Sequence, residues 1–553
     1  MEARKKRVGV FPAKEMRSRK NLFESLAQLF PVEFVESENG RDDGVEAILL
    51  LEGTREKALR IGETGVRCFA VLSPSRGQNE TVHLGTAPVV FEKDAHLPRY
   101  FRGQSLMDEG VQEASAVKLV QDDRTICSKN GHPLWLYRTE GKAPVDFVMV
   151  GPPKLPEGQF LFQHFQPGDF MRLLPLLHFL REVTEADSWV SPGVRACFMF
   201  DDPNLHSLRY GFVDYREVVR RARAGKYHVS FATVPLDSWW INSKAASLFR
   251  ENSAWVSLLI HGNNHTKREL SQRSPESQMV RIMSQALRRV TRLEDRAGVE
   301  VSRVMAAPHG ACSEEMARIL LRLGFDAACI SLGSLRAHNR DREWPATTGL
   351  EMVEFLGGGL PVIPRFGVGR NSRAEILLRV FLNRPVICMG HHADAKSGLE
   401  PLDEVAQIMS SLAHPIWMDM KAIARSNFLS RIEGELLIVK MYSRRIALRI
   451  PDGMRGVTVE RPWMHNVSSE ERVIVKGIAS GSISEIAGRI TRCFSVEGCE
   501  DIEIASVANE ALDFQEIPSP AVSAWPIARR LLTEFRDRTL PLMQRGARIF
   551  GLA

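Results

Sequence analysis

The sequence predicts a multidomain α/β protein whose largest part is a (β/α) barrel. The chain has 553 residues, 44% apolar and 25% charged, which suits about two to four domains with buried cores. Between residues 195 and 412, short apolar runs alternate with helical patterns. About seven such units favour a closed barrel over an open sheet. The segments before and after have different patterns of apolar and polar residues, so we expect further domains on both sides.

Residues 1–104 are expected to form a Rossmann-like α/β domain, because short apolar strands alternate there with helical stretches. The strands are predicted at Arg7–Phe11, Val32–Val35, Val45–Leu51 and Val66–Leu72. Neither GxGxxG nor GxxxxGK[ST] occurs in this part, so we assign no nucleotide to it.

Residues 105–190 are predicted to be a connecting region with a β-hairpin and a helix. Lys129-Asn130-Gly131-His132 carries the Asn-Gly signal of a tight hairpin turn between two apolar runs. The helix is expected over Phe170–Arg181, where Pro175 either kinks it or marks its start.

Residues 191–428 are predicted to form the barrel. The expected strands are Arg195–Phe200, His228–Val234, Val256–Ile260, Arg303–Ala307, Ala327–Ser331, Met352–Leu356 and Pro385–Met389. Helical patterns separate most of them, and His414–Ser426 would close the barrel.

The last two segments are predicted to be a β-sandwich and a helix. Residues 429–520 contain short strands separated by turn residues, which is typical of a sandwich. Residues 521–553 are predicted to be an amphipathic helix with Ile527, Leu531, Leu532 and Phe535 on one face and arginines opposite. Such a helix could dock on the protein or lie on an anionic membrane surface, so peripheral membrane contact is one expectation.

Composition and charge exclude several classes of protein. The net charge of +6 is small for this length and does not identify a nucleic-acid binder, which would need a concentrated basic face, so no nucleic-acid partner is expected. No run of about 18 apolar residues predicts a membrane span, and the N-terminus lacks the apolar stretch of a signal peptide. We therefore expect a cytoplasmic protein, or one held at the inner membrane face.

Two motifs at the ends of predicted barrel strands point to a metal. Asp201 and Asp202 follow an apolar run, so one could bind a metal while the other takes a proton from water. The same residues before Pro203-Asn204 also suit an ordinary turn. His261 and His265 lie four residues apart, a spacing that suits one metal ion.

Two further motifs fall at later strand ends, where barrel enzymes keep their active sites. Pro308-His309-Gly310 is expected to make a tight turn whose backbone N–H groups can point into the site. His391 and His392 follow the last clear strand. Each motif has a structural interpretation, and the shared placement is what favours a site.

In this order and spacing, the four motifs resemble those of the NodB-homology polysaccharide deacetylases, carbohydrate esterase family 4, over residues 190–425. The resemblance implies a NodB-like barrel and a divalent metal ion, zinc, held by Asp202, His261 and His265. It further implies that Asp201 is the general base. The backbone N–H of His309, next to Gly310, would stabilise the oxyanion. His391 would be the general acid, with His392 as its rival.

The chain departs from the family pattern in several places. Ala306 stands where the family has an arginine that steadies the catalytic aspartate, and Arg303 is one candidate to replace it. Pro203-Asn204 stands where the family has Gly-Pro. Asp341-Arg342-Glu343-Trp344 resembles the fourth family motif only weakly. We expect Arg365 and Arg370 at the rim, where they could meet a phosphate or carboxylate of the substrate.

The predicted function is metal-dependent removal of an N-acetyl group from an amino sugar or a glycan precursor. Because the location expected is cytoplasmic, the reaction would serve synthesis of a surface polysaccharide. One alternative is an amidohydrolase acting on a small non-sugar amide. Another is a carbohydrate-binding protein on the same fold that has lost turnover.

Overall fold

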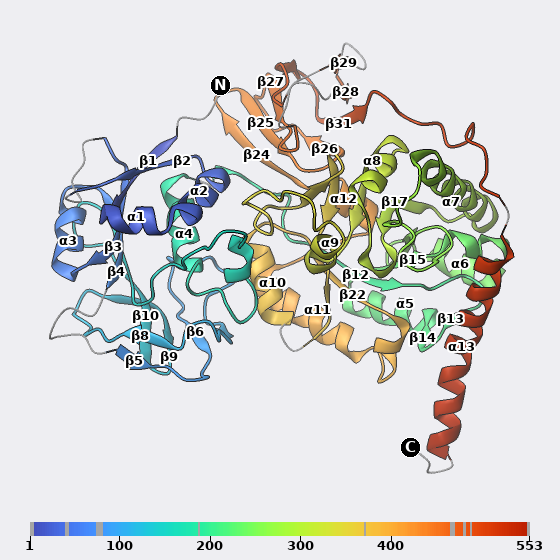
Figure 1. Ribbon diagram of the computed structural model, residues 1–553, viewed down its shortest axis with the longest axis horizontal. Coiled ribbons are helices and arrows are strands. Elements are labelled where there is room, and N and C mark those ends of the chain that lie inside the picture. The colour runs from blue at the N-terminus through green and yellow to red at the C-terminus, as the bar shows by residue number, and fades with distance from the viewer. Residues whose placement is uncertain are drawn as a thin grey trace. The chain divides into compact units, whose positions relative to one another are not determined.

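Figure 1 shows the computed structural model, which describes residues 5–38, 44–72, 81–185, 188–369, 372–464, 471–478, 483–486, 489–521 and 523–549. The chain divides into two compact units. The first comprises residues 1–189, 343–351 and 370–382, and the second comprises the remainder.

The first unit is built on a nine-stranded mixed sheet of order β2-β1-β3-β4-β11-β10-β9-β6-β7. The parallel strands are β1 (Lys6–Phe11), β2 (Val32–Glu36), β3 (Ala47–Gly53), β4 (Arg67–Leu72) and β11 (Val145–Val148). The antiparallel strands are β10 (His132–Arg138), β9 (Arg124–Lys129), β6 (Val89–Phe91) and β7 (Ser105–Leu106). The unit also contains β5 (Thr81–His83), β8 (Glu113–Ser115), α1 (Ala13–Ser18), α2 (Lys20–Leu29), α3 (Arg55–Glu63), η1 (Leu161–His164), α4 (Leu174–Val183) and α10 (Ser372–Phe381).

This sheet is mixed rather than purely parallel, because the predicted hairpin adds antiparallel strands to it. The turn at Asn130 and Gly131 has positive φ at both residues and joins β9 to β10 as expected. Strand β10 then pairs with β11, which lies parallel to β4. Strands β9, β10 and β11 therefore continue the sheet begun by β1–β4. In α4, Pro175 stands in the first turn, where a missing N–H costs nothing.

The second unit contains a barrel-like parallel sheet of order β20-β18-β17-β16-β15-β12-β22-β21. Its strands are β12 (Arg195–Asp201), β15 (Val229–Thr233), β16 (Val256–Ile260), β17 (Val301–Ala306), β18 (Ala327–Cys329), β20 (Leu360–Ile363), β21 (Phe366–Gly367) and β22 (Val386–Gly390), with β23 (Ile416–Trp417) against β12. The segments between strands include β13 (Arg209–Tyr210), β14 (Val213–Asp214), α5 (Tyr215–Gly225), η3 (Pro235–Trp239), α6 (Ser243–Glu251), α7 (Glu276–Ala297), η4 (Pro308–Gly310), α8 (Glu314–Arg322), α9 (Leu332–Ala337), η5 (His392–Ala395), α11 (Glu400–Ala413) and α12 (Met420–Ala424). Every residue of β12 is buried, as expected for a strand covered on both faces.

One predicted barrel strand is wrong. Met352–Leu356 was expected to join the parallel series, but β19 (Glu354–Leu356) runs antiparallel to β20 at the edge of the sheet. Gly357, Gly358 and Gly359 all have positive φ and reverse the chain. The strand that continues the parallel series is therefore β20, which the sequence analysis missed.

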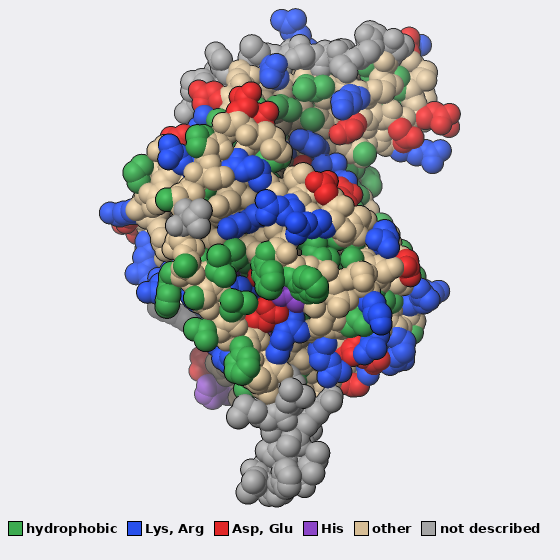
Figure 2. All heavy atoms as spheres, turned by 90° about the vertical axis from the view of Figure 1, so that its right-hand side faces the viewer, with side chains coloured by type: hydrophobic (Ala, Val, Ile, Leu, Met, Phe, Trp, Pro, Cys, Tyr) green, Lys and Arg blue, Asp and Glu red, His purple; other side chains and the backbone are tan. Residues whose placement is uncertain are grey.

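The chain ends in α13 (Ala524–Ile549), which belongs to the second unit. Figure 2 shows the face that carries this helix, where hydrophobic side chains gather with Lys and Arg around them. Among the described residues, no helix combines the length and the apolar character needed to cross a membrane.

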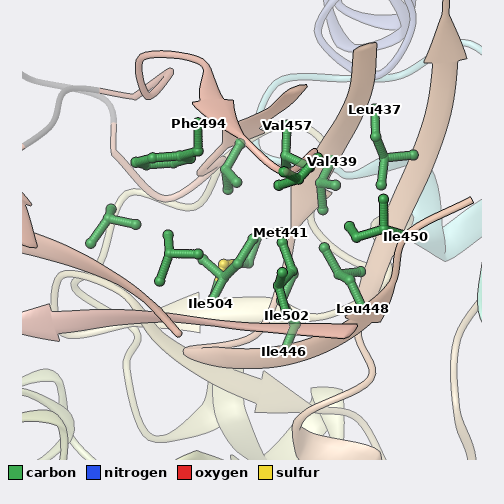
Figure 3. Close-up of a cluster of buried hydrophobic side chains, with 14 of the residues drawn as sticks. Leu437, Val439, Met441, Ile446, Leu448, Ile450, Val457, Phe494, Ile502 and Ile504 are labelled. Atoms are coloured by element: carbon green, nitrogen blue, oxygen red, sulfur yellow. The ribbon is translucent and has the colours of Figure 1, made fainter. Parts of the chain in front are cut away.

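Two four-stranded sheets precede α13. One has the order β24-β25-β27-β30 and the other β26-β31-β28-β29. Their strands are β24 (Phe428–Glu433), β25 (Leu436–Met441), β26 (Arg445–Arg449), β27 (Gly456–Glu460), β28 (Glu471–Lys476), β29 (Ile483–Ile486), β30 (Phe494–Ser495) and β31 (Asp501–Ala508). Alternate residues of β25 and β31 are buried, so each strand turns one side toward a common core. Figure 3 shows that core, in which Val439 and Val457 face Leu448 and Ile504.

Candidate metal centre

The candidate site lies at the carboxyl ends of the parallel strands. Asp201 is the last residue of β12 and Asp202 follows it, while His261 comes directly after β16. Asp202 and His265 have positive φ, at 78° and 55°. Positive φ is uncommon outside glycine and gathers at functional sites. The local backbone therefore holds these two side chains in unusual directions.

Asp202, His261 and His265 converge. The Nε2 atom of His265 lies 3.0 Å from Asp202 Oδ1, and that of His261 lies 3.6 Å from the same oxygen. One ligand atom from each of the three residues falls within 4.8 Å of the other two. One carboxylate and two imidazoles form a donor set that zinc prefers, with a coordination position left open.

Hydrogen bonding supports a cation between these atoms. Nδ1 of His261 lies 2.8 Å from the carbonyl oxygen of Ala306. A carbonyl only accepts, so Nδ1 carries the proton and Nε2 presents a lone pair to Asp202. Burial lowers the pKa of His261 to about 4, which keeps the ring neutral near pH 7. That unprotonated Nε2 faces Asp202 Oδ1 at 3.6 Å and cannot donate a hydrogen bond to it. Two facing lone pairs repel each other unless a cation lies between them.

The loop that carries both histidines is organised by Glu269. Its buried carboxylate accepts hydrogen bonds from the backbone N–H groups of Asn263, Asn264 and His265. Gly262 has φ of +64°, and a Cβ there would lie 2.1 Å from Glu269 Oε1. The loop therefore needs glycine at 262 and a carboxylate at 269. The sequence analysis missed Glu269, because no motif marks a residue that acts on backbone groups.

Asp201 is paired with Arg365, which corrects the expected position of that arginine. Nη1 of Arg365 donates to Asp201 Oδ1 at 2.8 Å, and the two side chains are only 5% and 3% exposed. Arg365 is thus not a rim residue open to substrate anions. Burial alone would raise the pKa of Asp201, but the Arg365 guanidinium holds it below its usual value. Arg365, rather than the candidate Arg303, is therefore the arginine that contacts Asp201.

Arg303 pairs with a different carboxylate from that of Asp201. Arg303 donates to both oxygens of Glu294, at 2.9 and 2.8 Å, close to the end of α7. Arg370 lies outside the described residues.

The turn after β17 lies beside the metal-ligand triad formed by Asp202, His261 and His265. His309 has φ of 57°, and its ring centroid lies 5.3 Å from that of His265. Gly310 has φ of 65°, and a Cβ at that position would come within 2.6 Å of Ser334. The turn is therefore tight and requires glycine at this position.

The two histidines after β22 differ in exposure. The His391 side chain is 52% exposed, and its backbone N–H donates to Asp394 Oδ2 at 2.7 Å. His392 is 9% exposed, and its Nε2 lies 3.5 Å from Asp537 Oδ2 on α13. Of this pair, His391 is the imidazole that a substrate can reach.

Helix α13 contributes arginine contacts to the site that no sequence motif predicts. Arg530 donates to both carboxylate oxygens of Asp237 and to the carbonyl oxygen of Asp202. Arg529 donates to the carbonyl oxygen of His265. Two arginines of one helix therefore contact the backbone of two triad residues. They are separated from those residues by more than 250 positions in the sequence.

Solved structures match part of the chain. They include a protein from Mycobacterium smegmatis assigned to the polysaccharide deacetylases (13% identity, 43% of this chain and 91% of that chain, TM-score 0.31). A second is the family 4 carbohydrate esterase from Streptomyces lividans in complex with acetate (14%, 40% and 90%, 0.24). A third is a family 4 esterase from Streptococcus mutans (15%, 41% and 91%, 0.23).

No protein-family model and no curated protein matches the chain. The structural matches to family 4 carbohydrate esterases and polysaccharide deacetylases span about 40% of the chain.

Proposed function

We propose that the second unit is a metal-dependent deacetylase that removes an N-acetyl group from an amino sugar or a glycan precursor. The observation that carries the proposal is the convergence of Asp202, His261 and His265. Nε2 of each imidazole lies within 3.6 Å of Asp202 Oδ1, and the lone pair of His261 Nε2 is directed at that oxygen. Zinc is the divalent ion that we assign to it. When bound, such an ion supplies Lewis acidity toward an amide carbonyl and makes water more acidic.

The remaining residues supply the other requirements of amide hydrolysis. Asp201, held ionised by Arg365, is assigned to take the proton from the attacking water. The backbone N–H of His309 is assigned to donate to the carbonyl oxygen as negative charge develops there. His391, exposed beside the site, is assigned to deliver a proton to the departing nitrogen, which must leave as an amine.

A paired measurement of metal and acetate tests this proposal. The zinc content of the full chain is compared with that of Asp202→Asn, and acetate release is assayed on a panel of N-acetylated sugars. We expect Asp202→Asn to lose one equivalent of zinc and all acetate release. His83→Asn, at an exposed position in the first unit, is the control and should change neither.

Other outcomes distinguish the alternatives. Loss of one zinc without acetate release from any sugar would favour a small non-sugar amide as the substrate. Unchanged zinc content in Asp202→Asn would overturn the metal site and leave a carbohydrate-binding role without turnover.

We further propose that the enzyme acts at an anionic membrane surface, on a glycan precursor made on the cytoplasmic side. The outward face of α13 carries Trp525, Leu532 and Phe535, each about two-thirds exposed. Trp239 and Trp240 are also exposed. Trp239 lies near α13, because both it and the helix contact His206. The ring centroids of Trp239 and His206 are 5.1 Å apart, and Nδ1 of His206 lies 2.9 Å from Glu534 Oε1.

The charges on α13 favour a bilayer as the partner. Its carboxylates at Glu534 and Asp537 are buried against the rest of the unit. Arg536 pairs with Asp537, but its own side chain is exposed beside the apolar side chains. The outward face therefore combines aromatic and aliphatic groups with positive charge. That combination is typical of helices that lie in the headgroup region of anionic membranes.

Co-sedimentation with vesicles tests the membrane proposal. We expect the full chain to bind vesicles containing phosphatidylglycerol, and to bind pure phosphatidylcholine much less. The double variant Leu532→Ser/Phe535→Ser should lose binding, while Ile432→Ser, which removes an exposed apolar side chain from β24, should not. Equal binding by both variants would contradict the assignment.

A further inference from the structure

A second cluster of metal-binding side chains lies in the first unit. His178 and Glu182 stand four residues apart on α4, so they share one face of that helix. His96 comes from the segment that follows β6, and Asp146 from the buried strand β11. This cluster has no part in the proposed deacetylase chemistry, and no sequence motif predicts it.

The distances between ligand atoms suit a tetrahedral ion. Nδ1 of His96 lies 3.5 Å from Glu182 Oε1, and Nε2 of His178 lies 3.8 Å from the same oxygen. One atom from each of the three residues falls within 4.8 Å of the others. Ligands around a tetrahedral zinc ion with bonds of about 2.0–2.1 Å are separated by roughly 3.4 Å. Small side-chain movements would therefore complete the coordination.

The hydrogen bonds around His96 leave the required nitrogen free of a proton. Nε2 of His96 lies 3.1 Å from Asp146 Oδ1, which also accepts from Trp135 Nε1 at 2.8 Å. A buried carboxylate accepts, so in the neutral ring Nε2 carries the hydrogen and Nδ1 presents a lone pair to Glu182. A carboxylate behind a histidine ligand in this way is the usual support of a zinc site.

The two carboxylate oxygens of Glu182 have different partners, and this fixes the orientation of the side chain. Arg67 donates to Oε2 at 2.6 Å, and Oε1 faces the two histidines. The ring of His96 is stacked on Tyr137 at 3.7 Å, and the His96 side chain is only 2% exposed. The ligands are thus already positioned by packing, which lowers the cost of binding an ion.

The charges of the cluster also favour a cation. Asp146 and Glu182 contribute two carboxylates, and Arg67 contributes one guanidinium, which pairs with Glu182. With neutral imidazoles, one negative charge remains in largely buried surroundings. A buried charge of this kind is costly unless it is paired or coordinates a metal.

We propose that the first unit binds a zinc ion through His96, His178 and Glu182, with Asp146 as the positioning residue behind His96. The ion would join α4 to the segment after β6. Three protein ligands leave one coordination position for water or another small ligand. This site is independent of the proposed deacetylase.

The test is zinc binding by the full chain, measured by titrating the chelator-stripped protein with zinc alone and by metal analysis. We expect Glu182→Gln and His178→Gln each to remove one equivalent that Asp202→Asn leaves in place. Asp146→Asn should weaken that binding about 10- to 100-fold without abolishing it. Circular dichroism checks that each variant is folded, and His83→Asn is the control.

The possible results separate this site from the deacetylase site. If Glu182→Gln loses one zinc and Asp202→Asn loses none, the first-unit site stands and the deacetylase site fails. If folded Glu182→Gln and Asp146→Asn bind zinc with the stoichiometry and affinity of the wild type, the first-unit site is overturned, whatever Asp202→Asn shows.

Discussion

Arg365 donates a 2.8 Å hydrogen bond to Asp201, across 164 positions of sequence and within the buried part of the second unit. The contact gives the proposed base an arginine partner although Ala306 stands at the position where the resembled family has one. Arg365 follows β20, and Asp201 ends β12. The arrangement therefore arises from the fold rather than from a local motif.

The first prediction concerns this pair. Arg365→Met should lower kcat for deacetylation about 100-fold or more, because the base loses the group that orients it, while zinc content stays unchanged. Arg365→Lys should restore part of the activity. Arg303→Met is the matched control and should retain wild-type kcat, since Arg303 pairs with Glu294. Equal losses in both methionine variants would contradict this role.

The second prediction concerns the loop between the two triad histidines. Gly262→Ala should destabilise the protein by about 2 kcal/mol or more and weaken zinc binding, because its Cβ would meet both Glu269 and Pro308. Gly324→Ala is the matched control. Gly324 also has positive φ, but a Cβ at that position would meet nothing within 4 Å. This substitution should cost only about 1 kcal/mol, from backbone strain alone. Chemical denaturation of the two variants measures the difference.

The third prediction distinguishes the two histidines after β22. His391→Gln should lower kcat about 100-fold with little change in stability, because the ring is exposed and is assigned as the acid. His392→Gln should instead lower the melting temperature, because that ring is buried beside Asp537. If His392→Gln removed activity without destabilisation and His391→Gln had no effect, the assignment would be reversed.

The fourth prediction is the pH dependence of α13 docking. Both nitrogens of His206 face acceptors, Nδ1 the carboxylate of Glu534 and Nε2 the carbonyl of Asp237, so the folded protein favours the charged ring. Burial alone would lower the pKa of His206, but the hydrogen bond with Glu534 raises it above its usual value. Burial alone would raise the pKa of Glu534, but His206 and Arg538 hold it at about 2.

The sign of the effect follows from these shifts. The contribution of His206 is complete below about pH 6.5 and is lost as the pH rises through its higher folded pKa. That of Glu534 is present above about pH 4.5 and is lost as the pH falls toward 2. The melting temperature of the wild type should therefore exceed that of His206→Gln most between about pH 4.5 and 6.5. A difference that grows above pH 7 would contradict the pairing.

The parts of the site that could be predicted from sequence are those marked by local spacing. Asp201 ends the mostly apolar strand β12 and Asp202 follows it, while His261 and His265 follow the mostly apolar strand β16, so strand ends and short motifs located them. The alternation of strands and helices likewise predicted the parallel sheet of the second unit. Its edge was missed at β20, because three glycines reverse the chain where a continuing strand pattern was expected.

The remaining residues act through contacts between distant parts of the chain. Arg365 and Arg530 each reach the site from a separate element, and no spacing rule connects them to the motifs. The same holds for His96 and His178, which come together only because a segment after β6 and helix α4 pack near each other. Such pairings depend on tertiary packing, which a single sequence does not display.

The most direct test is a crystal structure of the full chain grown with zinc, with anomalous diffraction collected at the zinc edge. The account predicts an anomalous peak about 2.0–2.2 Å from Asp202 Oδ1, His261 Nε2 and His265 Nε2. Crystals soaked in zinc that show no peak there, or that show these three side chains turned away from one another, would contradict it.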